Sequence, residues 1–215
     1  MPIDVEELIL ESIKRRDEKV NIELAVLIST ANDSKSVSKL FELLNNSKKE
    51  IQYDCIKTIY EIGARNPELI SPHLNELLPY LKSKNNRLVW GAMTSISSVA
   101  SMIPTKIFPV LPEIIDGSER GSVIAKDHAM KILRTLAEVK KYQNEIIPLM
   151  LEQLKLAPDN QFPSYALLIS EVIDKLNSNH FVQIISVRIK TIETESKIKT
   201  LNKILKSLSN KGFIS

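Results

Sequence analysis

The chain has 215 residues, of which 43% are hydrophobic and 26% are charged, and its formal net charge is +3 at pH 7. It is long enough to bury a substantial core and too polar for an integral membrane protein. Its single cysteine, Cys55, excludes an internal disulfide and a cysteine-based metal site. The three histidines lack the paired spacing of metal ligands, so we expect no metal and no cofactor.

In the first residues, MPIDVEELILESIKRR, charged side chains interrupt the apolar positions, and no apolar run is longer than three residues. This pattern differs from that of a secretory signal and from that of a spanning helix. We therefore expect a cytoplasmic protein with no membrane span.

Helical periodicity extends along nearly the whole chain. Glycine is scarce, apolar residues recur at spacings of three and four, and alternating strand-like runs are absent, which predicts an all-α protein. In chain order, the predicted helices form about six antiparallel pairs: 4–15 with 17–31, 34–45 with 48–64, 67–82 with 86–102, 104–116 with 122–139, 143–156 with 162–176, and 179–192 with 194–210.

The central pairs repeat with a period of 37 residues, which places Tyr53 on Trp90 and Cys55 on Ala92. The same shift carries Ala92 to Ala129, and Ala129 to Ala166. Each second helix thus has a small residue near its start, which lets neighbouring helices approach closely. We expect these four small residues to be structural.

This pattern resembles the HEAT repeat family over residues 34–176. The family's second helix begins with an apolar residue, an arginine, two variable positions and an alanine; the corresponding segments here are IQYDC, LVWGA, AKDHA and FPSYA. The small residue is kept, whereas the arginine is replaced by Gln52, Val89, Lys126 and Pro163. Prolines in the first helices are similar to those of the family: Pro79, Pro112 and Pro148.

The resemblance implies a right-handed α-α superhelix of about six HEAT-like helix pairs. We expect one solenoid over residues 1–215, with the pair at 177–215 as its C-terminal cap. Residues 180–215 carry seven basic and two acidic side chains, so the rest of the chain has a net charge of −2. A basic amphipathic helix can also bind membranes or acidic proteins, but an end repeat needs a polar outer face in any case.

The resemblance also implies that the second helices line the concave surface. On the helix at 48–64, positions 53, 57 and 60 lie opposite the apolar stripe. Carrying this face along the repeat gives the candidate partner-binding residues, which are Tyr53, Lys57, Tyr60, Trp90, Asp127, Lys131 and Arg134. Trp90 has two open interpretations: it covers apolar surface between neighbouring helices, or it is the hot spot of a partner site.

These residues favour a non-enzymatic scaffold or adaptor that binds a protein or peptide. The alternative is a nucleic-acid-binding protein or a HEAT-like DNA glycosylase, which would use Trp90, Asp127 and Arg134 in the groove. That resemblance departs at Thr94, where the glycosylases have an acid. Phosphates could also meet a rim of basic turn residues: Lys48, Lys49, Lys82, Lys84, Arg87 and Arg120.

Overall fold

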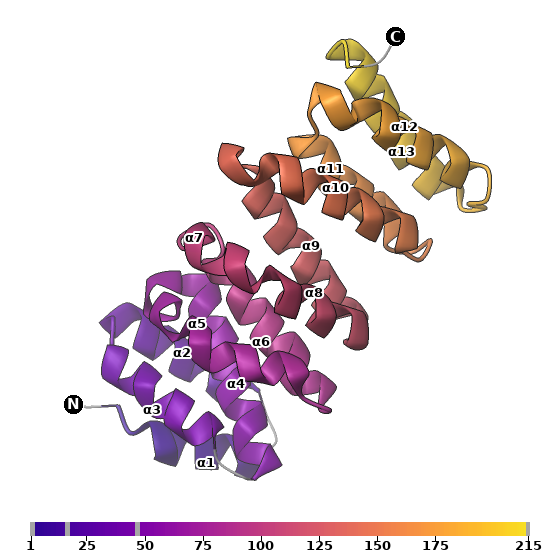
Figure 1. Cartoon of the computed structure of the whole chain (residues 1–215). Coiled ribbons are helices and arrows are strands. Elements are labelled where there is room, and N and C mark those ends of the chain that lie inside the picture. Colours follow the sequence, from indigo (N-terminus) through magenta and orange to yellow (C-terminus); the bar gives the residue numbers. More distant parts are fainter. Residues whose placement is uncertain (1–2, 16–17, 46–47, 214–215) are drawn as a thin grey trace. The chain divides into compact units, whose positions relative to one another are not determined.

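A computed structural model describes residues 3–15, 18–45 and 48–213 of the chain (Figure 1). In these residues all regular elements are helical and no strand occurs, which confirms the all-α class. The chain divides into two compact units, Met1–Ala129 and Met130–Ser215. Helix α9, Val123–Ala137, crosses this division, and each unit is considered by itself.

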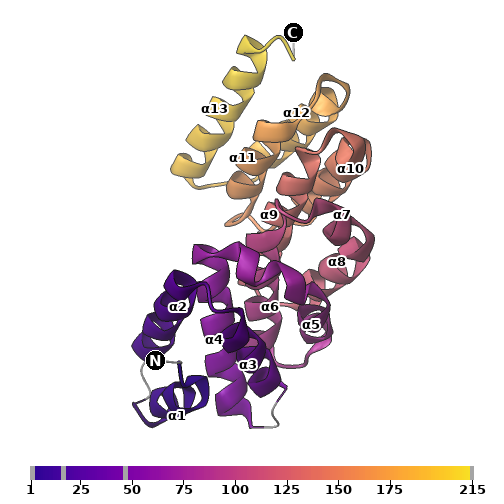
Figure 2. The ribbon, with the colours of Figure 1, turned by 90° about the vertical axis from the view of Figure 1, so that its left-hand side faces the viewer.

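The first unit consists of two layers of helices. Its first-helix layer contains α1 (Val5–Arg15), α3 (Ser34–Leu44), η1 (Pro67–Leu69), η2 (Ser71–His73), α5 (Leu74–Leu77), η3 (Leu78–Lys82), α7 (Pro104–Ile107), η4 (Phe108–Val110) and α8 (Leu111–Arg120). Its second-helix layer contains α2 (Lys19–Ala31), α4 (Lys49–Arg65) and α6 (Asn86–Val99). Within this layer α2 packs on α4 and α4 packs on α6, as Figure 2 shows.

The second unit has the same layering. It contains α10 (Lys140–Leu156), α11 (Phe162–Val172), α12 (Lys175–Ile189) and α13 (Glu195–Asn210). The first helices α10 and α12 pack together, and so do the second helices α11 and α13. Because like helices pack on like, each pair buries its apolar stripes against the next pair, as the repeat pattern predicts.

Two predicted helices are not continuous. The segment predicted as one helix at 67–82 is a series of short 3-10 and α turns, and the segment at 104–116 consists of the short elements α7 and η4 followed by α8. Each of these short elements except α5 has a proline at its first or second position. Proline lacks the N–H that would continue the preceding helix, so closely spaced prolines divide it. A single proline is tolerated, because Pro148 lies inside α10.

The small residues of the repeat are buried, as expected. Cys55, Ala92, Ala129 and Ala166 are each at most 3% exposed. Burial also raises the pKa of the Cys55 thiol, which keeps it protonated and unreactive. Cys55 is therefore a packing residue.

Two glycines bring α4 and α6 close together. A Cβ atom on Gly91 would lie 2.5 Å from Cγ1 of Ile56, and a Cβ on Gly63 would overlap the Ser98 hydroxyl. At Gly91 only glycine allows so close an approach, whereas at Gly63 the Ser98 hydroxyl would have to rotate away from an added methyl group. The contacts fix the relative positions of α4 and α6 along their axes, and with them the side chains at the surface of this layer.

Candidate partner-binding surface

An aromatic pair joins α4 to α6 on the second-helix layer of the first unit. The ring centroids of Tyr60 and Trp90 lie 5.3 Å apart, with the ring planes tilted by 50°. Both side chains are half-buried. Trp90 thus packs against the neighbouring helix and still presents part of its surface to solvent, which combines features of its two interpretations.

Lys57 lies beside this pair but is not a free cation. Its Nζ atom is 4.8 Å from the centre of the Tyr60 ring, and the residue is only 8% exposed. Its charge is shared with Glu61 at 2.9 Å and Glu18 at 3.4 Å. Burial alone would lower the pKa of Lys57, but hydrogen bonds to Tyr60 and Glu61 outweigh it and raise that pKa. Lys57 therefore holds the surface together rather than reaching out from it.

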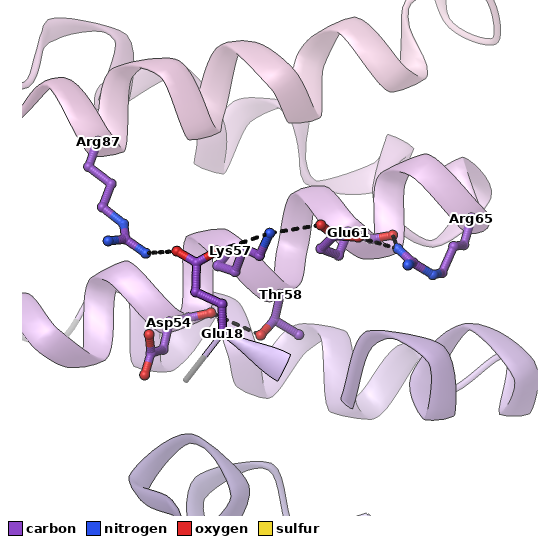
Figure 3. Close-up of polar contacts among 7 residues, drawn as sticks. All are labelled: Glu18, Asp54, Lys57, Thr58, Glu61, Arg65 and Arg87. Carbon is purple, nitrogen blue, oxygen red and sulfur yellow. Dashed lines mark hydrogen bonds and ion pairs between the residues drawn. The ribbon is translucent and has the colours of Figure 1, made fainter. Parts of the chain in front are cut away.

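The ion pairs around Lys57 connect three consecutive second helices (Figure 3). Glu18, at the start of α2, accepts a hydrogen bond of 2.8 Å from Arg87 of α6 and also pairs with Lys57 of α4. Farther along α4, Glu61 pairs with Arg65. Burial would raise the pKa of Glu61, but hydrogen bonds from Lys57 and Arg65 lower it below its usual range. The network keeps these charges paired and fixes the layer beneath Tyr60 and Trp90.

A second carboxyl group on α4 behaves differently. Burial raises the pKa of Asp54 above its usual range, although hydrogen bonds with Ser12 and Asn21 and the positive charge of Arg87 oppose the rise. Asp54 borders a pocket of about 430 Å³ that Glu18 and Arg87 also line. The structure therefore places two carboxyl groups of opposite pKa shift, Asp54 and Glu61, on one helix.

Tyr53 belongs to the other end of α4. Its hydroxyl accepts a hydrogen bond of 2.8 Å from Nδ2 of Asn85, in the turn before α6. The guanidinium carbon of Arg87 lies 5.0 Å from the centre of the Tyr53 ring. The structure thus brings Lys57, Tyr60 and Trp90 together, and places Tyr53 at the turns.

The remaining candidate residues lie on α9. Asp127 is half-buried in the first unit, and Lys131 is exposed in the second. Arg134 is paired with Glu138 at 3.0 Å and with Glu171 of α11 at 2.9 Å. Within the second unit, Arg134 therefore links two second helices, much as Glu18 does in the first.

Sequence reasoning missed Glu18, Asp54 and Glu61. The pairing of Lys57 with Glu61, and of Glu61 with Arg65, follows a spacing of four residues on one helix and was visible in the sequence. The contact of Glu18 with Arg87 was not, because 69 residues separate them.

Metal-binding clusters and membrane-spanning helices are two other features by which a chain can show its function. No group of three His, Cys, Asp or Glu side chains in this part of the chain could hold a metal ion. No described helix is both long enough and apolar enough to cross a membrane.

The fold is that of known helical-repeat proteins. A computationally designed armadillo repeat protein for modular peptide recognition matches with a TM-score of 0.66 and 14% identity over 94% of this chain and 99% of its own. A designed armadillo repeat protein in complex with the peptide (KR)4 matches with a TM-score of 0.64 and 15% identity over 95% and 99% of the two chains. An archaeal HEAT-like repeats protein from Thermococcus onnurineus NA1 matches with a TM-score of 0.58 and 14% identity over the full length of both.

No family model matches the sequence. No curated protein matches it either. The structural matches define the chain as an α-solenoid of the armadillo and HEAT-like type, and at these identities they define the fold alone.

Proposed function

We propose that the chain is a non-enzymatic scaffold that binds a protein or peptide on the second-helix layer of the first unit. The observation that carries this proposal is the half-buried Tyr60–Trp90 pair. Trp and Tyr dominate binding hot spots because they supply large, rigid contact areas. The ion pairs of Lys57 hold the helix beneath the pair in place, which lowers the entropic cost of binding.

Two exposed apolar residues lie on α2, which packs against α4. Asn66, at the end of α4, donates a hydrogen bond of 3.1 Å to Asn32, at the end of α2. Tyr60 precedes Asn66 by as many residues as Val26 precedes Asn32, so Val26 of α2 is level with Tyr60 of α4. Leu27 is the next residue on α2. The two side chains are 44% and 52% exposed. Apolar side chains beside an aromatic pair suit a partner segment that carries apolar side chains of its own.

Two further observations agree with a binding role. The hydroxyl of Thr94, at the position of the glycosylases' acid, donates a hydrogen bond of 2.7 Å to the carbonyl of Trp90, so it serves the helix itself. One solenoid with a similar fold was designed for modular peptide recognition, and another was solved with a bound peptide.

The proposal is tested with peptides selected from a random library on the immobilised protein. We expect the selected peptides to lose affinity on Trp90→Ala and on Tyr60→Ala. Phe108→Ala, which truncates an aromatic residue of the first-helix layer, is the matched control and should leave binding unchanged. Selected peptides that bind all four proteins equally would contradict the proposal. Excision of methylated bases from DNA would favour the glycosylase alternative.

A further inference from the structure

A polar pocket lies at the turns that precede α4 and α6, at the opposite end of α4 from Arg65. It has a volume of about 780 Å³, within the range of small-molecule sites. Lys49, Gln52 and Tyr53 of α4 line one part of it, and Lys82, Lys84 and Asn85 line another. The pocket is distinct from the Tyr60–Trp90 surface, so what it binds does not depend on the proposed function.

The charged side chains that line this pocket are all positive. It has three lysines, and none of the lining side chains in the described part of the chain is a carboxylate. Lys49 and Lys84 make no ion pair with any described residue. Lys82 pairs with Glu113 at 2.8 Å, but both side chains are more than a third exposed, so this surface pair is weak and can open. The pocket therefore favours an anion.

Hydrogen bonds across the two turns hold the pocket walls in place. The Tyr80 hydroxyl lies 3.1 Å from the carbonyl oxygen of Leu44 and 2.8 Å from Oδ1 of Asn45. The Gln52 amide also donates to the Leu44 carbonyl, at 3.2 Å. Because Asn85 donates to the Tyr53 hydroxyl, that hydroxyl keeps its own proton for donation to a ligand. The walls thus offer neutral donors between the lysines.

The arrangement of the remaining rim cations indicates the size of the anion. Arg87 pairs with Glu18 at 2.8 Å, and Arg120 pairs with Asp116; neither arginine lines the pocket. The cations that line it therefore form one group and not an extended track for the backbone of a nucleic acid. Lys49, Lys82 and Lys84 instead surround one pocket.

We propose that this pocket binds a small molecule that carries a polyphosphate group. Three lysines can neutralise several phosphate oxygens at once, and the amides of Gln52 and Asn85 with the Tyr53 hydroxyl supply neutral hydrogen bonds. Inorganic polyphosphate and nucleoside triphosphates share this chemistry, and the experiment distinguishes them.

The test is calorimetric titration of the full chain at low ionic strength with sodium tripolyphosphate and, separately, with ATP. We expect Lys49→Gln and Lys84→Gln each to weaken binding of tripolyphosphate by about fivefold, as the loss of one charge-assisted contact at a solvated site implies. Glu113→Gln should strengthen binding, because it releases Lys82. Lys106→Gln, an exposed charge elsewhere in the first unit, is the control and should have little effect.

Equal affinity for the two probes would identify the polyphosphate group as the whole ligand, whereas tighter binding of ATP would add a contribution from the nucleoside. Absence of binding to both probes overturns the proposal. So does an equal loss on Lys106→Gln, which would show a general charge effect. A 20-base-pair DNA duplex that binds more tightly than tripolyphosphate overturns it as well, in favour of a nucleic-acid track. Circular dichroism of each variant confirms that it folds.

Discussion

Lys57 shows how a charged side chain becomes part of a packed layer. It lies on the face of α4 that was predicted to point away from the core. It is nevertheless buried, because Glu18, Glu61 and the Tyr60 ring surround it. A buried ammonium without such partners would lose its proton or destabilise the fold. The pKa shifts of Lys57 and Glu61 have the signs of a mutually stabilised pair.

The loss of stability caused by replacing Glu61 with glutamine should therefore depend on pH in a defined way. The pKa of Glu61 is lowered by folding, so its contribution is complete above the usual glutamate pKa of about 4.3 and disappears as pH falls below it. We expect Glu61→Gln to cost about 1–2 kcal/mol in urea denaturation at pH 7. The difference from the unmodified protein should shrink as pH falls through the lowered pKa of the folded state. Glu119→Gln, on the exposed side of α8, is the control; a loss that is constant with pH would contradict the pairing.

Trp90 and Met93 lie on one helix, but their truncation should have different effects. Met93→Ala should mainly reduce stability, whereas Trp90→Ala should mainly reduce partner binding. Met93 is fully buried, so Met93→Ala should cost about 2–5 kcal/mol of stability. Trp90 is half-buried, so Trp90→Ala should cost less than the roughly 3–5 kcal/mol of a buried tryptophan. With a peptide that binds the Tyr60–Trp90 surface, Trp90→Ala should weaken binding by more than about 2 kcal/mol. Denaturation curves and binding titrations on the same samples give both quantities; unfolding by Trp90→Ala would make it a packing residue only.

At the scale of the element, α3 illustrates how a helix start is fixed by one side chain. Asp33 accepts hydrogen bonds from the backbone N–H groups of Lys35 and Ser36, at 3.0 and 3.1 Å, and from the Ser36 hydroxyl at 2.7 Å. These bonds with Ser36 are the main cause of a lowered Asp33 pKa. We expect Asp33→Ala to cost about 1 kcal/mol of stability, and Asp33→Asn to cost less because it keeps an acceptor. Thermal unfolding at neutral pH measures both; equal losses would contradict a capping role.

The packing of α6 on α4 depends on Gly91. Alanine normally stabilises a helix relative to glycine by about 1 kcal/mol, but here its methyl group would meet Ile56. We expect Gly91→Ala to destabilise the protein by about 1–3 kcal/mol through overpacking. In the Ile56→Ala background the same change should cost less or become favourable, because the obstructing atoms are gone. A double-mutant cycle by urea denaturation measures this coupling, and additive effects would contradict the contact.

Much of the element structure followed from the sequence, and the failures have physical causes. The helix predicted at 34–45 is observed at Ser34–Leu44, because its apolar period and the Asp33 cap agree. The segments at 67–82 and 104–116 were predicted as continuous helices from the spacing of their apolar residues. Their prolines cannot donate the backbone hydrogen bonds that a continuous helix needs, so each segment is divided. Periodicity records which side chains are buried and not which amide groups are paired.

The site was less predictable, since a repeat period does not give the offset between stacked helices. The period of 37 residues aligned Trp90 with Tyr53, whereas Gly91 meets Ile56 and Ser98 meets Gly63 across the interface. The spatial offset at these two contacts is 35 residues, two fewer than the period, and the ring contact between Trp90 and Tyr60 joins residues only 30 apart. The burial of Lys57 was unpredictable for a related reason: its partner Glu18 comes from another helix.

At the scale of the whole molecule, both units are built from helices that pack on their nearest neighbours. In such arrays local stability depends on adjacent repeats, so damage should remain local. We expect Ile169→Ala, a fully buried change in α11, to accelerate amide hydrogen exchange in α10, α11 and α13 and to leave α2–α4 unchanged. Ile59→Ala in α4 should show the converse, with faster exchange in α2, α3, α4 and α6. Uniform acceleration by either variant would contradict a repeat array.

The glycine contacts between α4 and α6 also bear on how such a chain can evolve. The repeats share one pattern of apolar residues, but the position of Gly91 is occupied by Asp54 in the preceding repeat and by His128 in the following one. Either side chain, transplanted opposite Ile56, would occupy the space that Gly91 leaves open. Duplication, deletion or shuffling of a single repeat would therefore create a steric clash at the interface between neighbouring repeats. The order of the repeats is therefore part of what the sequence encodes, and an inserted repeat needs compensating substitutions at its interfaces with its neighbours.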